Sequence, residues 1–390
     1  MSAHKKWLPL HPIMAERMII GYDAKRIVSN GTGLGSYGRT LVADLAERDD
    51  LDLHLYAPDD GRIELRNQVP ERDNLHYHFA GKHTALGKAL WRSHGIVRQL
   101  RRDGIQVYHG LSGELPKGIS RSGIRSVVTI HDLIFMRHPE YYHKADVAIY
   151  TRKFRQALRE ADRIVAISEC TRRDICELGG IDKSRVSVIY QSCAPRFTAE
   201  PDTKLLWQVR EKYDLPDRYI LNVGTIEERK NVLLAVRALH RLPDDVSLVI
   251  VGRETDYTAS VYEYVIEHRL VNRVMILQGV TDAELPAFYC MADAFVYPSR
   301  YEGFGIPVIE AISAGLPVVA CKGSCLEEAG GPDSLYVAPD DDEAMAHAVS
   351  QVLFGASGRQ QRIDRSRQYI RRFSNNDAAE HFAQLYTSLL

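Results

Sequence analysis

Residues 297–311 read Tyr-Pro-Ser-Arg-Tyr-Glu-Gly-Phe-Gly-Ile-Pro-Val-Ile-Glu-Ala, and they form a unit that indicates the fold class. The apolar run 294–297 predicts a short buried strand, the glycines that follow predict a loop, and Pro307 suits the first turn of a helix. This succession is typical of a parallel α/β sheet, in which ligands bind at the carboxyl ends of the strands. The loop is therefore the first candidate binding site.

The two carboxylates of this stretch occupy different settings. Glu302 lies on the expected loop, where the backbone N–H groups of the next three residues are free to point at a ligand. Those groups belong to Gly303, Phe304 and Gly305. Glu310 lies on an otherwise apolar helix, where an unpaired charge is costly unless it accepts hydrogen bonds. Vicinal ribose hydroxyls would donate two such bonds; the alternative is that Glu310 faces water.

Short Val- and Ile-rich segments recur between longer segments with helical spacing, which predicts parallel sheets covered on both faces. The expected strands are 18–22, 51–56, 106–109, 126–130, 163–167 and 186–190, and then 219–223, 246–251, 274–278, 294–297, 318–321 and 335–337. They predict two doubly wound α/β domains, 18–200 and 201–372. The segment 373–390 carries apolar residues at helical spacing and predicts a last helix.

Composition excludes several classes of protein. Lys and Arg number 50 against 51 Asp and Glu, a formal net charge of −1, so we expect no nucleic-acid partner. The apolar runs are far shorter than the ~20 residues that cross a bilayer, and the start of the chain does not resemble a signal peptide. The six cysteines form no Cys-x-x-Cys pair, so we expect neither a disulfide framework nor a metal site. These observations predict a cytoplasmic protein.

The charge is divided unevenly. Residues 1–200 hold 31 basic and 24 acidic side chains, whereas residues 201–390 hold 19 and 27. The excess of cations is concentrated between Lys82 and Arg102, where six basic residues alternate with apolar ones that include Trp91. Such a segment predicts contact with the anionic inner face of a membrane. Alternatively it is a surface helix packed on the first domain, because Gly87 and Gly95 weaken a single continuous helix.

A glycine-rich segment follows the first expected strand. Residues 30–38 read Asn-Gly-Thr-Gly-Leu-Gly-Ser-Tyr-Gly and open a helical segment at 37–48, so Gly33, Leu34 and Gly35 can present backbone N–H groups to a phosphate. The glycine spacing resembles a dinucleotide fingerprint, but about ten residues separate strand and glycines where that fingerprint needs almost none. We therefore discount NAD. A flexible loop without a ligand is the alternative.

Adjacent cations follow another expected strand, 219–223. Residues 224–231 read Gly-Thr-Ile-Glu-Glu-Arg-Lys-Asn and lead into a helix. Arg229 offers a planar fork to phosphate oxygens and Lys230 a point charge, so the pair suits a diphosphate without a metal ion. The alternative is that both cations pair with Glu227 and Glu228 on a solvated surface.

Together these segments resemble the signature of retaining glycosyltransferases of the GT-B fold. More narrowly, they resemble the large family of bacterial hexosyltransferases that includes mannosyltransferases using GDP-mannose. The resemblance covers about residues 18–390. It implies two Rossmann-like domains facing across a cleft, with the acceptor on the first and the nucleotide sugar on the second. It also implies a last helix that crosses back to the first domain, and no cofactor.

The resemblance implies roles for single residues. In that family the second Glu of a Glu-x7-Glu pair holds the ribose, the first Glu and the amides after it hold sugar hydroxyls, and an Arg-Lys pair neutralises the diphosphate. These roles fall to Glu310, to Glu302 with residues 303–305, and to Arg229 with Lys230. Further donor contacts are expected at Gly33, Leu34, Gly35, Gly224, Thr225, Gly279 and Val280.

His131 and Asp132 end the expected strand 126–130, and the family carries a His-Asp pair at this place beside the transferred sugar. We expect His131 to act there, although from the residues alone a capping or core histidine is the better interpretation. Asp132 is expected only to orient the imidazole. Without a clear carboxylate nucleophile, we expect retention by attack from the leaving-group face, with the departing phosphate oxygen taking the acceptor proton.

The resemblance implies transfer of a hexose, first of all mannose from GDP-mannose, to a saccharide or lipid-linked saccharide in cell-surface polysaccharide synthesis. A sugar-nucleotide epimerase of the same architecture, acting on a UDP-sugar without an acceptor, is the main alternative. A phosphorylase would need a lysine for pyridoxal phosphate and a longer chain. A non-catalytic two-domain binding protein is disfavoured because no export signal is evident.

Overall fold

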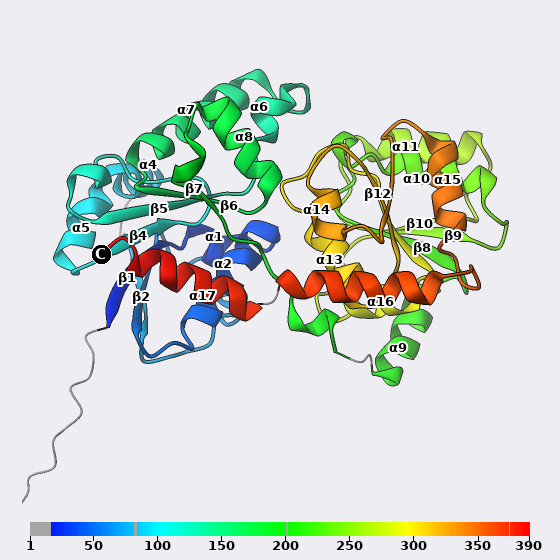
Figure 1. Ribbon diagram of the computed structural model, residues 1–390, viewed down its shortest axis with the longest axis horizontal. Helices are drawn as coiled ribbons and strands as arrows, with labels where there is room; N and C mark the ends of the chain where they lie inside the picture. The colour runs from blue at the N-terminus through cyan, green and yellow to red at the C-terminus, as the bar shows by residue number, and fades with distance from the viewer. Residues whose placement is uncertain (1–16, 82–83, 200–201, 374) are drawn as a thin grey trace, which may run out of the picture.

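The computed structural model describes residues 17–81, 84–199, 202–373 and 375–390, and arranges them as two α/β domains side by side (Figure 1). The first domain holds a seven-stranded sheet in the order β3-β2-β1-β4-β5-β6-β7, and the second a six-stranded sheet in the order β10-β9-β8-β11-β12-β13. Neighbouring strands are parallel in both sheets. The two doubly wound domains expected from the sequence are confirmed.

The first domain runs through seven strands and eight α-helices within the described residues. The strands are β1 (Met18–Asp23), β2 (Leu51–Ala57), β3 (Leu75–Phe79), β4 (Val107–Gly110), β5 (Arg125–Ile130), β6 (Arg163–Ala166) and β7 (Val186–Val188). The helices are α1 (Lys25–Ser29), α2 (Gly33–Leu45), α3 (Ile63–Arg66), α4 (Ala85–Leu90), α5 (Ile96–Arg102), α6 (Ile134–Arg137), α7 (Lys144–Glu160) and α8 (Glu169–Gly179).

The second sheet consists of β8 (Tyr219–Val223), β9 (Ser247–Val251), β10 (Val274–Leu277), β11 (Ala294–Tyr297), β12 (Val318–Cys321) and β13 (Leu335–Val337). The remaining helices are α9 (Thr203–Tyr213), α10 (Val232–Ala238), α11 (Thr258–Glu267), α12 (Leu285–Met291), α13 (Ile306–Ser313), α14 (Leu326–Gly330), α15 (Asp342–Ser350), α16 (Arg359–Ile370) and α17 (Asn375–Thr387).

One strand, β3, is absent from the sequence prediction. Its residues Leu-His-Tyr-His-Phe alternate between apolar and polar side chains, and it forms one edge of the first sheet. The strands expected from the sequence are runs of consecutive apolar residues, which is the pattern of strands buried on both faces. An edge strand with one half-exposed face does not show that pattern.

The glycine-rich segment differs from the expectation. Helix α2 begins at Gly33, not at residue 37, so Gly33, Leu34 and Gly35 form its first turn instead of a loop. Gly35 is required there, because a Cβ at this position would lie 1.8 Å from the carbonyl oxygen of Asn30. The short helix α1 accounts for the long separation between β1 and the glycines.

The last helix, α17, crosses from the second domain to pack on α2 of the first (Figure 1). Phe382 and Tyr386 are buried in the core beneath β1 and β2. The Tyr386 hydroxyl lies 3.2 Å from that of Tyr22 and 2.7 Å from Nδ1 of His109. The expected return of the chain to its first domain is confirmed.

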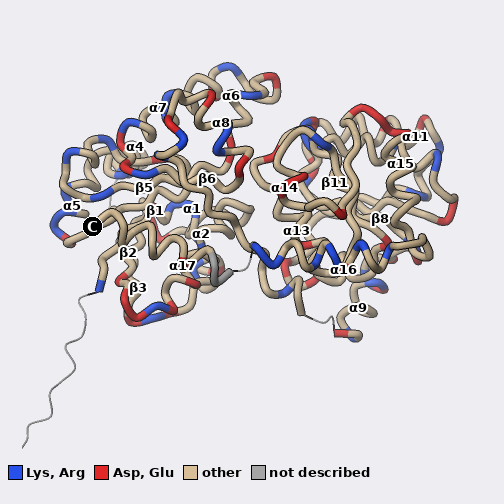
Figure 2. The backbone as a smooth tube through the Cα atoms, viewed as in Figure 1, with Lys and Arg blue, Asp and Glu red and all other residues tan. Residues whose placement is uncertain are grey.

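Within the described residues no helix is long and apolar enough to cross a membrane. All six cysteines, which lie in the described ranges, are free thiols. Lys and Arg recur along α5 and α7 of the first domain, and α4 carries Lys88 (Figure 2). These surface helices hold part of the basic excess of the first half.

Candidate active site

The loops that follow β8 and β11 meet at the carboxyl edge of the second sheet, where these two strands are neighbours. The ammonium of Lys230 is hydrogen-bonded to Oε1 of Glu302, and Nη1 of Arg229 lies 3.2 Å from Oε2 of the same carboxylate. Lys230 Nζ also donates to the Tyr297 hydroxyl at 2.8 Å. The backbone N–H of Arg300 donates to the Arg229 carbonyl at 2.9 Å and ties the two loops together. One carboxylate thus holds two cations.

Both cations are mostly buried: their side chains are 14% (Arg229) and 17% (Lys230) exposed. Arg229 does pair with Glu227, at 2.5 Å, but the solvated surface considered as an alternative is not observed. Burial alone would raise the pKa of Glu302, but the adjacent ammonium and guanidinium lower it to about 2. Glu302 is therefore ionised near neutral pH, and it holds side by side a guanidinium and an ammonium, the two groups that bind phosphate oxygens.

Glu310 projects from α13 and does not simply face water. It accepts a hydrogen bond of 2.9 Å from the hydroxyl of Tyr289. Burial raises its pKa to about 7, and the nearby charges of Arg196 and Asp282 act on it in opposite directions. Asp282 belongs to the loop that follows β10 and also contains Val280. The structure therefore brings this loop close to Glu310.

The other donor contacts expected in the second domain lie at the same edge of its sheet. Gly224 and Thr225 directly follow β8, whereas Gly279 and Val280 follow β10. Phe304 packs in the core cluster beneath α13. β9 lies between β8 and β10 and is parallel to both, so these two pairs of residues follow strand ends at the carboxyl edge of one sheet, where ligands of such sheets bind.

The glycine-rich loop after β11, which contains Gly303 and Gly305, lies directly against the first domain. The carbonyl oxygen of Gly303 accepts hydrogen bonds from Oγ of Ser168 at 2.6 Å and from Oγ1 of Thr171 at 3.1 Å. A Cβ on Gly303 would lie 2.2 Å from the carbonyl oxygen of His131. Ser168 caps α8 as expected, accepting from the Thr171 N–H at 2.9 Å. Ser168 also donates a hydrogen bond from one domain to the other, and the residues around it in the sequence do not predict this second role.

A second group of contacts joins the domains beside the first. The hydroxyl of Tyr301 donates to Oδ2 of Asp174 at 2.6 Å. The carboxylate of Glu328 accepts from the backbone N–H of Glu169 at 2.8 Å and from the hydroxyl of Tyr190 at 2.7 Å. The N-terminal end of α8 is thus held by an acidic side chain of the other domain, where negative charge is favoured. These contacts hold the two domains against each other.

His131 does not have the surroundings that the sequence suggested. Its Nε2 donates to the Leu111 carbonyl at 2.8 Å, and its Nδ1 lies 2.9 Å from the amide nitrogen of Gln191. Asp132 instead accepts from the backbone N–H of Ile134 at 3.1 Å. The expectation that Asp132 orients the imidazole is therefore wrong. Burial lowers the pKa of His131 to about 4, so the ring is neutral and both nitrogens are engaged within the protein.

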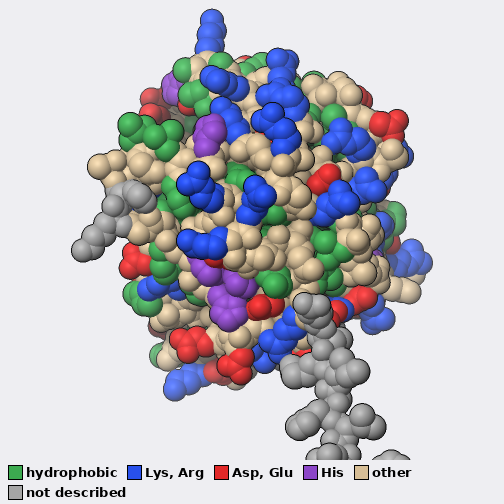
Figure 3. Space-filling view, turned by 90° about the vertical axis from the view of Figure 1, so that its left-hand side faces the viewer, with side chains coloured by type: hydrophobic (Ala, Val, Ile, Leu, Met, Phe, Trp, Pro, Cys, Tyr) green, Lys and Arg blue, Asp and Glu red, His purple; other side chains and the backbone are tan. Residues whose placement is uncertain are grey.

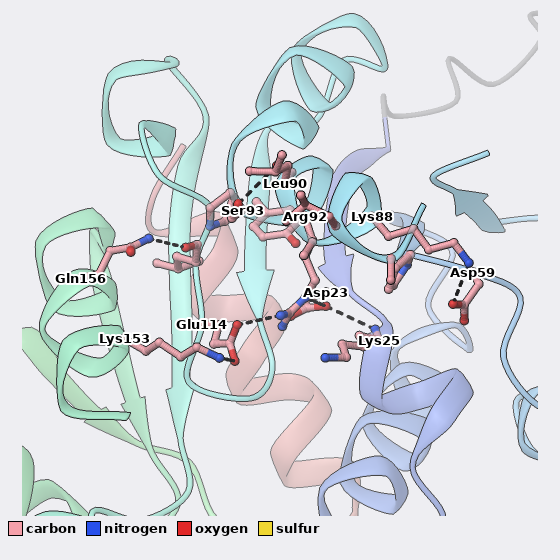
Figure 4. Close-up of a pocket in the computed structure, with 17 residues that line it drawn as sticks. Asp23, Lys25, Asp59, Lys88, Leu90, Arg92, Ser93, Glu114, Lys153 and Gln156 are labelled. Carbon is pink, nitrogen blue, oxygen red and sulfur yellow. Dashed lines mark hydrogen bonds and ion pairs between the residues drawn. The ribbon is translucent and has the colours of Figure 1, made fainter. Parts of the chain in front are cut away.

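Two cavities of the first domain adjoin each other and share Glu114 and Lys153 in their walls. The smaller, of about 160 Å³, is lined by Leu34, His131 and Asp132 among others. It brings the first turn of α2 together with the end of β5. The larger, of about 540 Å³, extends to α4 and carries several charged side chains (Figure 4). Its charged lining consists of Asp23, Lys25, Asp59, Lys88, Arg92, Glu114 and Lys153.

The basic segment is divided into α4, a π-helical turn (Trp91–Gly95) and α5. Arg92 points into the larger cavity, where it pairs with Asp23 and with Glu114 (Figure 4). Lys88 pairs with Asp59 at 3.1 Å. Arg92 and Lys88, two of the six cations expected to meet a membrane, thus face protein carboxylates. A third, Lys82, lies outside the described residues. Exposed cations remain on α5, beside the exposed side chains of Leu86 and Leu90 on α4.

Both halves of the chain match models of known protein families. The Glycosyltransferase Family 4 model matches residues 31–192, and the model of glycosyl transferases group 1 matches residues 206–369. The chain is 29% identical to the O-antigen chain mannosyltransferase B of Escherichia coli, over 88% of this chain and 92% of that protein. It is also 29% identical to the O-antigen chain mannosyltransferase RfbU of Salmonella typhimurium, over 58% and 60% of the two chains.

Solved structures share the two-domain architecture. The sucrose-phosphate synthase of Thermosynechococcus elongatus superposes with a TM-score of 0.76 at 19% identity, over 96% of this chain and 99% of that chain. HepE of Anabaena in complex with UDP and glucose superposes with a TM-score of 0.74 at 16% identity, over 96% and 100%. At these identities the likeness concerns the fold.

Proposed function

This chain is a glycosyltransferase of the GT-B fold, and we propose that it transfers a hexose from a nucleoside-diphosphate sugar to a saccharide or lipid-linked saccharide of a cell-surface polysaccharide. Mannose from GDP-mannose is the first candidate donor, because both curated relatives described above are named O-antigen mannosyltransferases. Both names denote transfer, which favours a transferase over the epimerase considered from the sequence.

The observation that carries the proposal is the pairing of Glu302 with both Arg229 and Lys230 at the carboxyl edge of the second sheet. A donor diphosphate bound at the two cations places its hexose next to Glu302 and the amides of residues 303–305. Glu310 then holds the ribose, and Gly279 with Val280 meets the base. Gly224 and Thr225 complete the edge, and Gly33 to Gly35 approach from the first domain.

We propose that the reaction retains the anomeric configuration and needs no metal ion. The acceptor hydroxyl attacks the anomeric carbon from the face of the leaving group while the bond to the diphosphate breaks, and the departing phosphate oxygen takes the acceptor proton. Arg229 and Lys230 stabilise the negative charge that develops on the diphosphate. His131, with both ring nitrogens engaged within the protein, shapes the wall beside the transferred sugar, and its one N–H is donated to the Leu111 carbonyl.

The two adjoining cavities suit an amphiphilic acceptor. The polar end, around Asp132, lies beside the proposed hexose position, and the walls continue past Lys153 to Lys25. The far end is bordered by Leu86 and Leu90 of α4, which are 71% and 55% exposed. We propose that the saccharide of the acceptor occupies the polar end and that its lipid leaves along α4. This arrangement places α4 and α5 at the inner face of a membrane.

Ligand-dependent thermal unfolding tests the donor. GDP, UDP, ADP and their hexose conjugates are added separately, and a ligand at ~100 times its dissociation constant adds about 2.7 kcal/mol to stability. We expect GDP and GDP-mannose to raise the melting temperature most. Stabilisation by UDP-sugars alone would overturn the mannose assignment. Conversion of the donor to an epimer without acceptor would overturn transfer, and NMR of the product's anomeric proton reports retention.

A further inference from the structure

Away from the cleft, Asp52, His54 and His76 bring three metal-ligating atoms together on β2 and β3. One ligand atom from each residue lies within 4.8 Å of the other two. Asp52 Oδ1 is 2.9 Å from Nε2 of His76, and Asp52 Oδ2 is 3.6 Å from Nε2 of His54. Neighbouring ligands of a tetrahedral zinc ion with bonds of about 2.0–2.1 Å are about 3.3–3.4 Å apart. The two observed distances, one to each oxygen of the Asp52 carboxylate, lie on either side of that value.

The geometry of the sheet produces this cluster. His54 and His76 are partners in the parallel pairing of β2 with β3. Side chains two residues apart lie on one face of a strand, so Asp52 shares the face of His54, and His78 that of His76. The opposite face of the same strands is apolar and packs in the core of the first domain. The backbone pairing of β2 with β3 thus fixes the positions from which the three side chains project.

Further hydrogen bonds orient His54. Its Nδ1 lies 2.8 Å from Nε2 of His78, which leaves Nε2 of His54 facing Asp52. The other ring nitrogen of His78 is 4.0 Å from Asp103, whose carboxylate accepts a hydrogen bond of 2.9 Å from the hydroxyl of Tyr56. Histidines that bind metals typically engage their second nitrogen in this way, which fixes the tautomer and the ring.

The cluster is accessible to ions from solution. The side chains of Asp52, His54 and His76 are 25%, 14% and 44% exposed. Figure 3 shows His side chains gathered at one place on this end of the first domain, among acidic and basic neighbours. None of the three residues lines either of the two cavities described above. The cluster is therefore separate from the transfer site.

We propose that Asp52, His54 and His76 bind a zinc ion, with water as the remaining ligand, and that the ion ties the edge strand β3 to β2. Two imidazole nitrogens and one carboxylate oxygen suit zinc, whereas magnesium and calcium prefer a shell of oxygens. The sequence predicted no metal site because its cysteines lack the usual spacing, and these ligands come from two segments that only the sheet brings together.

Zinc binding to the full chain, purified without a histidine tag and treated with chelator, tests the proposal. Competition with a chromophoric chelator should give one zinc ion per chain, and Co²⁺ should give the absorption of a tetrahedral site. His54→Gln and His76→Gln should each weaken zinc binding at least 10-fold, and His78→Gln, which removes an orienting partner, by about 10–100-fold. Zinc should raise the melting temperature of the wild type but not of His76→Gln.

His268→Gln is the matched control, since His268 is an exposed histidine next to His240 in the second domain. It should bind zinc as the wild type does, and circular dichroism confirms that each variant is folded. The proposal is overturned if the wild type takes up no zinc at micromolar concentration, or if the double variant of His54 and His76 binds as tightly as the wild type. None of these measurements depends on the sugar donor or on transfer.

Discussion

The hydroxyl of Ser168 donates a hydrogen bond of 2.6 Å to the carbonyl oxygen of Gly303, joining the N-terminal cap of α8 in the first domain to the glycine-rich loop of the second. The same loop carries Glu302, whose carboxylate holds both candidate diphosphate-binding cations. The contact between the two domains and the placement of Glu302 are therefore coupled through one short segment of backbone.

Ser168→Ala should lower transfer more than it lowers stability. Loss of an N-cap costs about 1 kcal/mol, and loss of the bond to Gly303 loosens the loop that positions Glu302. Asp341→Ala is the control, because Asp341 caps α15 by accepting from the Ala344 N–H at 2.8 Å. Urea unfolding should show similar losses for both variants, while kcat/KM should fall only for Ser168→Ala. Equal activities would contradict the coupling.

Arg229→Ala and Lys230→Ala should each slow transfer 10²–10³-fold. Removing one preorganised donor to a developing negative charge typically costs about 3–4 kcal/mol of transition-state stabilisation. The control is Arg237→Ala, an exposed cation on α10 that lies over the ring of Tyr264. Steady-state kinetics with the identified donor measures the effect. Wild-type rates for both site variants would refute the diphosphate assignment.

The stability of the protein should depend on pH through Glu310. Burial raises the pKa of this carboxyl to about 7 from an ordinary value near 4.5, so its protonated form stabilises the fold. That contribution is complete below pH 4.5 and is lost as the pH rises through 7, a change of about 3 kcal/mol. Glu310→Gln should remove this loss between pH 5 and 8 in urea unfolding. Glu211→Gln, an exposed change on α9, should leave it unaltered.

Two glycines in the first turn of α2 should respond oppositely to alanine. A Cβ at Gly35 would collide with the carbonyl of Asn30, so Gly35→Ala should destabilise the protein by about 1–3 kcal/mol or more. A Cβ at Gly33 meets nothing within 4 Å, so Gly33→Ala should raise stability by about 0.4–1 kcal/mol. Because Gly33 is proposed to approach the donor, Gly33→Ala should bind the donor less tightly although it is more stable. Calorimetric titration measures this affinity, and an affinity equal to that of the wild type would contradict the contact.

Membrane contact through α4 and α5 should require both apolar and basic side chains. We expect the protein to sediment with phosphatidylglycerol vesicles at low salt and less with phosphatidylcholine, and salt to weaken the interaction. Leu86→Ser and Arg101→Glu should each reduce binding. Arg365→Glu, an exposed change on α16 of the second domain, should not. Binding that is indifferent to salt, or absent altogether, would exclude the electrostatic interpretation.

The parallel strands could be predicted because burial on both faces produces consecutive apolar residues whatever the partner strands are. Segments 219–223 and 294–297 begin and end in the structure where the sequence placed them. The start of α2 at Gly33 was not predicted from the sequence. Glycine has a low helix propensity, but the guanidinium of Arg39 donates to the carbonyls of Ile27 and Asn30 and holds the turn in place.

The meeting of Arg229 and Glu302 could be predicted because both lie on short loops directly after strands, and they converge once those strands are paired. The surroundings of His131 in the first domain could not be predicted in this way. Which atoms meet the ring of His131 depends on Leu111 and Gln191, which lie 20 and 60 residues away. The hydrogen bond from Ser168 to Gly303 joins residues 135 positions apart, and no periodicity, charge pattern or spacing in the sequence predicts it.

The buried hydroxyl of Tyr386 also bears on how this molecule is made. Nδ1 of His109 and the hydroxyl of Tyr22, both buried in the first domain, each lie within hydrogen-bond distance of this hydroxyl of the last helix. During synthesis the strands of this domain leave the ribosome before α17, and Tyr386 follows His109 by 277 residues. The core of the first domain therefore includes a segment that is translated after the second domain, and it is complete only once α17 has packed on it.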